Sequence, residues 1–188
     1  EYPRTIGKDG KLKVTRKNDW TEGFYPGCLW YVYEYTNKED WKKAAIKWTE
    51  SLEPLKKMTN HHDIGFLMYC SFGNAYRLTG NEAYKDVLVE SARSLCTRFN
   101  EKTGCIKSWN YRKSWNGKDE WFYPVIIDNM MNLELLYFAT KVTGDSVYAK
   151  VANRHAETTA KNQFREDYSN YHVVNYDAET GEVLNQAT

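Results

Sequence analysis

A helix–turn–helix pattern occurs three times along the chain, and this repetition limits the fold more than any other feature of the sequence. Each copy begins with a threonine, and the three turns lie in Thr36–Ala45, Thr79–Leu88 and Thr143–Ala152. Gly80 and Gly144 suit the left-handed conformation that ends a helix. Asn81 and Asp145 suit the N-cap of the helix that follows. Repetition of one supersecondary unit predicts a stack of helical hairpins.

The helices before and after each turn differ in character. The runs before the turns are apolar and aromatic, and they include Leu29–Tyr33, Gly73–Tyr76 and Leu135–Ala139. The helix predicted over Tyr84–Phe99 is amphipathic, with an apolar stripe made by Val87, Leu88, Ala92 and Leu95. We therefore expect buried inner helices and amphipathic outer helices. The fold class predicted is all-α, with three hairpins that curve into about half of a ring.

Two segments lie outside the repeat. An aromatic-rich connection covers Glu101–Tyr123. The tail from Asp167 onward contains a predicted β-hairpin, with strands near His172–Tyr176 and Glu182–Leu184. We expect this tail to be accessory to the helices. The predicted domains are an N-terminal extension over 1–17, with a solvated, mobile basic stretch from Lys8 to Lys17, and a partial helical domain over 18–188.

The charge balance excludes some partners. The chain has 26 basic and 25 acidic residues, so its formal net charge is +1. This gives no reason to expect a nucleic acid or a membrane surface as partner, and a monomer is expected. No run of 18 apolar residues and no signal peptide is visible. Because the sequence carries no targeting signal, a periplasmic or secreted location is only an expectation, and a cytoplasmic one stays open.

Aromatic residues are unusually frequent, at 15% with seven Trp and fifteen Tyr. A flat aromatic ring can stack on the apolar face of a sugar, although an aromatic-rich core would give the same composition. The cysteines give less information. Cys28 and Cys70 are expected to be small buried thiols. Only Cys96 and Cys105 could form a disulfide, and nothing in their spacing requires one.

Trp20, Asp63 and Asp128 occupy the same position in the three repeats. Each precedes the threonine of its turn by the same distance, to within one residue. This places all three at the N-terminal ends of inner helices, and therefore at one rim of the cavity. An aspartate at a helix start is usually an N-cap. Asp128 fits that role poorly, because it lies with two amides in an otherwise apolar run, where an unpaired charge is costly.

Two carboxylates in unlike surroundings can divide acid and base roles between them. A metal site is the alternative for His61, His62 and Asp63. Adjacent histidines point in different directions on a helix, and no third or fourth ligand is placed by the sequence, so we expect neither a metal ion nor a cofactor. Walker, GxGxxG and GxSxG motifs are absent, which excludes common nucleotide and serine-hydrolase sites.

Three segments carry a resemblance to a known family. Asp19–Phe24, His61–Phe66 and Ile126–Asn132 closely resemble the unsaturated glucuronyl hydrolases of glycoside hydrolase family 88. The resemblance extends from about Asn18 to the last residue and leaves out the first 17. It implies an (α/α)6 barrel of inner and outer helices, of which this chain would hold about the first half.

The resemblance also implies roles for particular residues. Asp128 matches the general acid/base and Asp63 the second catalytic carboxylate, while Trp20, Trp109, His172 and His62 match positions that line the sugar site. The implied reaction is hydration of the 4,5-unsaturated uronic acid at the non-reducing end of glycosaminoglycan fragments made by lyases. Two alternatives stay open: a related unsaturated rhamnogalacturonyl hydrolase that acts on pectin fragments, and a non-catalytic helical-repeat scaffold.

Overall fold

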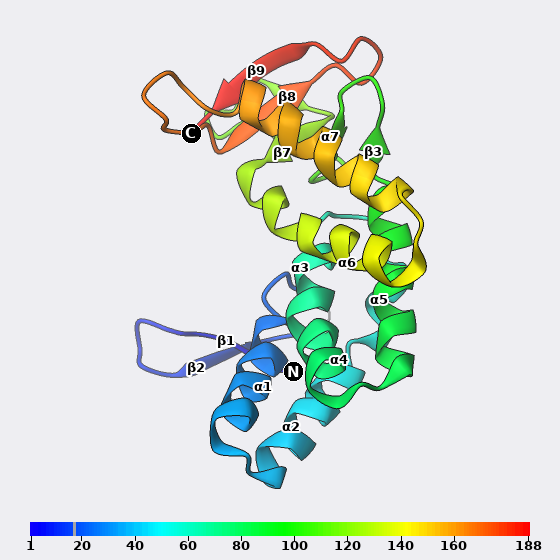
Figure 1. Cartoon of the computed structure of the whole chain (residues 1–188). Coiled ribbons are helices and arrows are strands. Elements are labelled where there is room, and N and C mark those ends of the chain that lie inside the picture. The colour runs from blue at the N-terminus through cyan, green and yellow to red at the C-terminus, as the bar shows by residue number, and fades with distance from the viewer. Residues whose placement is uncertain (17) are drawn as a thin grey trace. The chain divides into compact units, whose positions relative to one another are not determined.

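The computed structural model describes residues 1–16 and 18–188 of the chain. These residues form two compact units, each made of two stretches of sequence (Figure 1). The first unit contains Glu1–Lys57 and Phe66–Ser91, and the second contains Met58–Gly65 and Ala92–Thr188. Two of the boundaries fall within helices α3 (Ile64–Met68) and α5 (Glu82–Cys96), and the third lies between Lys57 and Met58. The second unit holds both aspartates that the sequence singled out.

The three predicted hairpins are present, and their threonines explain the repeat. The hairpins consist of α1 (Phe24–Thr36) with α2 (Glu39–Glu50), α4 (Asn74–Thr79) with α5, and α6 (Leu133–Thr143) with α7 (Val147–Asn162). Each threonine ends the first helix and donates its hydroxyl to the carbonyl four residues back, at 2.7 Å. The same oxygen accepts the backbone N–H two residues ahead, at 3.1–3.4 Å. One side chain thus satisfies groups on both sides of the turn.

The residues after the threonines close the helices as predicted. Gly80 and Gly144 adopt φ values of +67° and +76°, and their N–H groups bond to carbonyls of the preceding helical turn. Asn37 adopts the same conformation in the first hairpin, with φ of +53°. Asn81 and Asp145 each accept an N–H from the first turn of the next helix. The local chemistry of these turns therefore determines where the helices end and begin.

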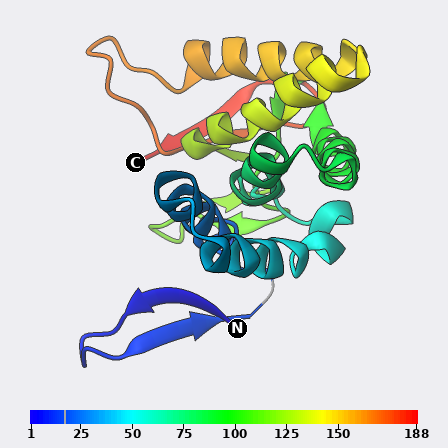
Figure 2. The ribbon, with the colours of Figure 1, turned by 60° about the horizontal axis from the view of Figure 1, so that its bottom comes forward.

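In the first unit, β1 (Tyr2–Ile6) and β2 (Leu12–Thr15) form an antiparallel hairpin, seen in blue in Figures 1 and 2. Tyr2 is buried and its hydroxyl lies 2.6 Å from Ser51 Oγ. Residues 8–16 are almost all exposed, as expected of a solvated stretch, and they form the turn and second strand of this hairpin, while Lys17 lies outside the described residues. The inner helix before Gly80 is composite: α3 leads into the π-helical turn η2 (Tyr69–Gly73) and then α4.

The second unit contains more β-structure than the sequence indicated. Two short antiparallel pairs occur in the aromatic connection, β3 (Phe99–Asn100) with β4 (Cys105–Ile106) and β5 (Arg112–Lys113) with β6 (Glu120–Trp121). The predicted C-terminal hairpin forms as β8 (Val173–Tyr176) and β9 (Val183–Ala187). It joins β7 (Pro124–Ile126) in a sheet of order β7-β8-β9. Figure 2 shows α6 and α7 as neighbouring helices of this unit.

The tail is a core element and not an accessory, which corrects the expectation. Val173, Val174 and Tyr176 are buried and belong to apolar clusters that also contain Val125 and Ile126 of β7. The short 3₁₀ helix η3 (Ile127–Asn132) follows β7 directly and leads into α6. The strand β7 therefore determines where Asp128 lies.

The burial of the helices and the state of the cysteines can be compared with the predictions. The stripe of α5 is buried, as predicted. Helix α1 is less enclosed than an inner helix should be, because Tyr31 and Tyr35 are 59% and 90% exposed. Cys28 is exposed and not buried, and Cys96 and Cys105 form no disulfide with each other. Among the described residues, no helix has the length and apolar character needed to cross a bilayer.

Candidate active site

Asp63 lies at the end of a tight turn, immediately before α3. The turn is held from outside by the segment that follows β4. The backbone N–H of His62 donates to the carbonyl of Ser108 at 3.2 Å, and His61 forms an isolated β-bridge with Trp109. The Asp63 carboxylate lies 3.0 Å from His61 Nδ1 and 3.1 Å from His62 Nε2. The carboxylate therefore lies beside two imidazoles.

Asp128 lies in η3, and the same serine holds the strand that precedes it. The Ser108 N–H donates to the carbonyl of Pro124 at 2.8 Å, and Ser108 Oγ accepts the N–H of Ile126 at 2.9 Å. Ser108 is fully buried. One residue thus bonds to the backbones of both aspartate-bearing segments.

The two carboxylates lie close together in the second unit. His62, Asp63 and Asp128 each offer a polar atom within 4.8 Å of the other two. Burial, and secondly the nearby Asp63 carboxylate, raises the pKa of Asp128 from 3.8 to about 6. Among the described residues, no hydrogen-bond partner is found for the buried Asp128 Oδ1. The arrangement suits a proton on Asp128 that is available to a bound molecule.

The amides beside Asp128 form a buried chain of hydrogen bonds. Asn129 Nδ2 donates to the carbonyl of Ile106 at 2.7 Å, and Asn132 Nδ2 donates to Asn129 Oδ1 at 2.9 Å. Asn132 Nδ2 also lies 3.2 Å from Nδ1 of His62. All three side chains are fully buried, and burial lowers the pKa of His62 to about 4. His62 is therefore neutral at physiological pH.

Arg98 is a buried cation that forms hydrogen bonds with several segments around the site. It is 8% exposed, and its guanidinium donates to the carbonyls of Thr59, Lys107 and Ser108 and to Asn110 Oδ1. Burial lowers the pKa of Arg98, and the negative charge of Asp63 opposes this effect. This buried cation thus connects the segments on either side of the site and contributes a positive field near Asp63.

The sequence placed no further metal ligand beside His61, His62 and Asp63. Asp128 joins His62 and Asp63 as a third potential donor. To bind a cation, however, both carboxylates must be ionised and His62 Nε2 must carry no proton. The raised pKa of Asp128 and the donation from Asn132 to Nδ1 both oppose this state. The donor chemistry therefore favours a proton over a cation.

Trp109 and His172, two of the predicted sugar-site residues, belong to an aromatic group in the second unit. Trp115 connects them, with its ring centroid 6.2 Å from each. The guanidinium of Arg112 stacks over both Trp109 and Trp115, at 4.6 and 5.1 Å. The carbonyl of His172 accepts the N–H of Ile127, so its backbone adjoins the segment of Asp128. The group presents flat surfaces of the kind on which a sugar ring stacks.

Trp20, another of the predicted sugar-site residues, belongs to the first unit. It is 46% exposed and packs edge-on against Phe24 and Phe66, with the Arg4 guanidinium 5.2 Å from its ring. The predicted rim shared by Trp20 and the two aspartates stays a prediction.

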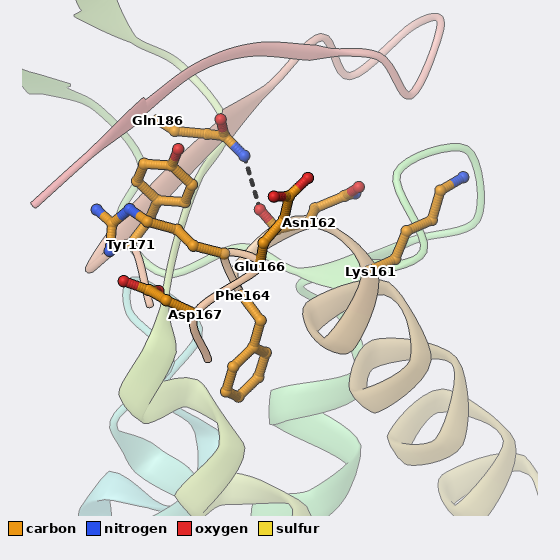
Figure 3. Close-up of a pocket in the computed structure, with 8 residues that line it drawn as sticks. Lys161, Asn162, Phe164, Glu166, Asp167, Tyr171 and Gln186 are labelled. Atoms are coloured by element: carbon orange, nitrogen blue, oxygen red, sulfur yellow. Dashed lines mark hydrogen bonds between the residues drawn. The ribbon is translucent and has the colours of Figure 1, made fainter. Parts of the chain in front are cut away.

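A separate hollow of about 580 Å³ lies beyond the end of α7, among Lys161, Asn162, Phe164, Arg165, Glu166, Asp167, Tyr171 and Gln186 (Figure 3). Within it, the Gln186 amide donates to the carbonyl of Asn162 at 2.7 Å, the dashed contact in Figure 3. The Arg165 guanidinium stacks on Tyr171 at 3.8 Å and donates to the carbonyl of Asn170. Neither Asp63 nor Asp128 lines this hollow.

The roles of Ser108, Trp115 and Arg98 in the site were not predicted from the sequence. Asn129 and Asn132 were noticed only as unusual buried amides, and that signal was sound. Trp115 is one of seven tryptophans, and only its position between Trp109 and His172 distinguishes it.

Comparison with known proteins gives consistent matches along the chain. The family model described as Glycosyl Hydrolase Family 88 matches residues 3–186, so the match begins earlier than the Asn18 expected from the motifs. An unsaturated glucuronyl hydrolase of Formosa agariphila is 48% identical over 190 residues, covering 100% of this chain and 46% of the relative. An unsaturated chondroitin disaccharide hydrolase of Streptococcus agalactiae is 36% identical over 196 residues, covering 100% and 47%.

A solved structure agrees with these matches. The crystal structure of an unsaturated glucuronyl hydrolase specific for heparin aligns with a TM-score of 0.90 at 44% identity, over 97% of this chain and 47% of that one. The chain therefore spans about half the length of the relatives that it matches.

Proposed function

The chain belongs to glycosyl hydrolase family 88, and from this premise we propose that the complete protein hydrates 4,5-unsaturated uronic acids at the non-reducing ends of glycosaminoglycan fragments. The relatives named for glucuronyl, chondroitin-disaccharide and heparin substrates support this substrate class. The observation that carries the proposal is the close pair Asp63 and Asp128, with a buried and unpartnered Asp128 Oδ1.

The reaction begins with protonated Asp128. It transfers its proton to C4 of the vinyl ether, and positive charge develops on C5 and the ring oxygen. The ionised Asp63 carboxylate stabilises that charge, because an anion fixed in a buried site needs no reorganisation to do so. The raised pKa of Asp128 keeps the acid form available at mildly acidic pH.

A water molecule then completes the hydration. The Asp128 carboxylate accepts a proton from this water as its oxygen bonds to C5, which restores the acid form of the enzyme. The resulting C5 hemiketal opens, C1 becomes a hemiacetal, and the next sugar leaves from C1. The net change is the addition of one water across the double bond followed by release of a keto acid. No cofactor takes part in these steps.

The resemblance extends this proposal to the surroundings of the pair. Trp20, Trp109 and His172 line the sugar site in this scheme, and Trp115 joins them through its contacts with Trp109 and His172. The three hairpins form about half of an (α/α)6 barrel, since the chain covers 46–47% of the relatives. A monomeric state and a periplasmic or secreted location stay predictions.

The test uses unsaturated disaccharides made by lyases from chondroitin, heparin and a pectic rhamnogalacturonan. Hydration removes the conjugated double bond, so ultraviolet absorbance falls as the substrate is consumed. We expect turnover of a glycosaminoglycan disaccharide, and loss of at least about 100-fold in kcat for Asp128→Asn and for Asp63→Asn. Glu157→Gln, which neutralises an exposed carboxylate of α7, is the matched control and keeps full activity.

The outcomes separate the three functions. Turnover of the pectic substrate alone would indicate an unsaturated rhamnogalacturonyl hydrolase. Undiminished turnover in Asp128→Asn would remove Asp128 from the chemistry. No turnover of any unsaturated disaccharide by the folded, complete protein would favour a binding scaffold.

A further inference from the structure

We propose that Asn129 and Asn132 are positioning residues that hold His62 as the Nε2–H tautomer, with the proton on the ring nitrogen that lies 3.1 Å from Asp63 Oδ1. The structural part of this inference concerns hydrogen bonds alone. Its consequence for catalysis rests on the proposed function.

The chain of bonds has one fixed end. The carbonyl of Ile106 can only accept a hydrogen bond, so the atom of Asn129 that lies 2.7 Å away must be the amide nitrogen. This determines which way the Asn129 amide faces, and its oxygen is left to accept. The Ile106 N–H is bound separately by Nδ1 of His155 at 3.0 Å, which holds the Ile106 peptide in place.

The orientation of the Asn129 amide determines that of the Asn132 amide. Because Asn129 Oδ1 accepts, the Asn132 atom at 2.9 Å must be its nitrogen. An amide nitrogen carries two protons, and the second is available to His62 Nδ1 at 3.2 Å. Nδ1 is therefore an acceptor and carries no proton.

A neutral imidazole whose Nδ1 accepts must carry its proton on Nε2. Complete burial keeps His62 neutral, because desolvation disfavours the imidazolium. Nε2 lies 3.1 Å from Asp63 Oδ1, although this contact does not meet the geometry of a hydrogen bond. Among the described residues, no acceptor bonds to Nε2. The proton thus lies on the ring nitrogen nearest the Asp63 carboxylate.

Gly65 shows independently that the position of Asn132 is closely determined. A Cβ at residue 65 would overlap the Oδ1 and Cβ of Asn132 and lie 2.6 Å from its Cγ. The missing side chain therefore provides the space that the Asn132 amide occupies.

The tautomer can be measured directly on the complete protein without substrate. The chain has four histidines, and long-range ¹H–¹⁵N correlation of their ring nitrogens distinguishes Nε2–H, Nδ1–H and imidazolium forms. The wild-type His62 should give the neutral Nε2–H pattern at pH 7. Asn132→Asp replaces the donor with an acceptor, so it should convert His62 to the Nδ1–H or imidazolium form. A wild-type Nδ1–H or imidazolium pattern would overturn the proposal.

Two further variants separate positioning from general stability. Asn132→Leu and Asn129→Leu should each lower kcat roughly 10- to 100-fold with little change in KM, as is typical when a supporting hydrogen bond is removed. Asn175→Leu is the matched control. Asn175 is also a buried amide of this unit, and its Oδ1 accepts the N–H of Tyr123 at 3.1 Å. This variant should lose stability yet keep the wild-type His62 pattern and kcat.

Equal effects of Asn132→Leu and Asn175→Leu on kcat would show that the amide chain is merely structural. Because the nuclear magnetic resonance pattern is read without turnover, the tautomer assignment can fail or succeed independently of the hydration chemistry.

Discussion

Replacing Asp128 by Asn should make the protein more stable at neutral pH while it abolishes turnover. Asp128 is held in surroundings that disfavour its charge, through burial and the neighbouring carboxylate of Asp63. Its pKa is 3.8 in an unstructured chain and about 6 in the folded protein. Folding therefore favours the protonated form. The neutral amide of Asn resembles that form, so the variant avoids the free-energy cost of a buried charge above pH 6.

The magnitude follows from linkage. A pKa raised by roughly two units corresponds to about 3 kcal/mol, at 1.36 kcal/mol per unit. Because Asp128 is only partly buried, solvent screening reduces this to about 1–3 kcal/mol. As for any group with a raised pKa in the folded state, the stability that Asp128 contributes is complete below pH 3.8 and is lost as pH rises through 6. The difference between Asp128→Asn and wild type should therefore appear between pH 4 and pH 6 and level off above.

Urea unfolding at several pH values between 3.5 and 8 measures this difference. Asp128→Asn should exceed wild type by about 1–3 kcal/mol at pH 7.5, and by much less at pH 4. Glu157→Gln, an exposed control in the same unit, should track wild type throughout. The reasoning is refuted if Asp128→Asn is less stable than wild type at pH 7.5, or if the gap between them does not change with pH.

Other predictions test the same site. In wild type, kcat should fall as pH rises through about 6, because the acid form of Asp128 is then lost; a kcat that rises over this interval contradicts the assignment. Asp63→Asn should lower the pKa of Asp128, measured by ¹³C carboxyl titration, since the neighbouring charge is removed while burial remains. Gly65→Ala should destabilise the protein by about 1–3 kcal/mol and lower kcat, because its methyl group displaces Asn132. Trp115→Ala should raise KM several-fold with little change in kcat, which initial-rate kinetics will show.

The helical hairpins could be predicted because their chemistry is local. A threonine and a left-handed residue occur together in all three turns, and a capping side chain follows them in the second and third. The close approach of Asp63 and Asp128 followed from the same repeat, since equivalent positions in stacked hairpins come together. The repeat thus predicted that the two aspartates share a site, without knowledge of the long-range contacts that hold them there.

What the sequence did not disclose depends on contacts between distant segments. The pairing of β7 with β8 joins residues about fifty positions apart, and neither strand is long enough to show a clear period. Ser108 bonds to Ile126, 18 residues away, and Asn132 contacts His62, 70 residues away, and serine and asparagine are residue types common on protein surfaces. Such roles appear only when the chain is folded.

The bonds of Ser108 to the segments of both aspartates have a consequence for how the protein acquires activity. The segments of Asp63 and Asp128 are joined through a third piece of chain, so helix formation alone cannot bring the carboxylates into register. Contacts between residues far apart in sequence form late, because closing the loop between them costs chain entropy before the contact can stabilise the fold. During refolding, far-ultraviolet circular dichroism should therefore recover before catalysis. The interval between the two signals would measure how long after helix formation the Ser108 contacts form.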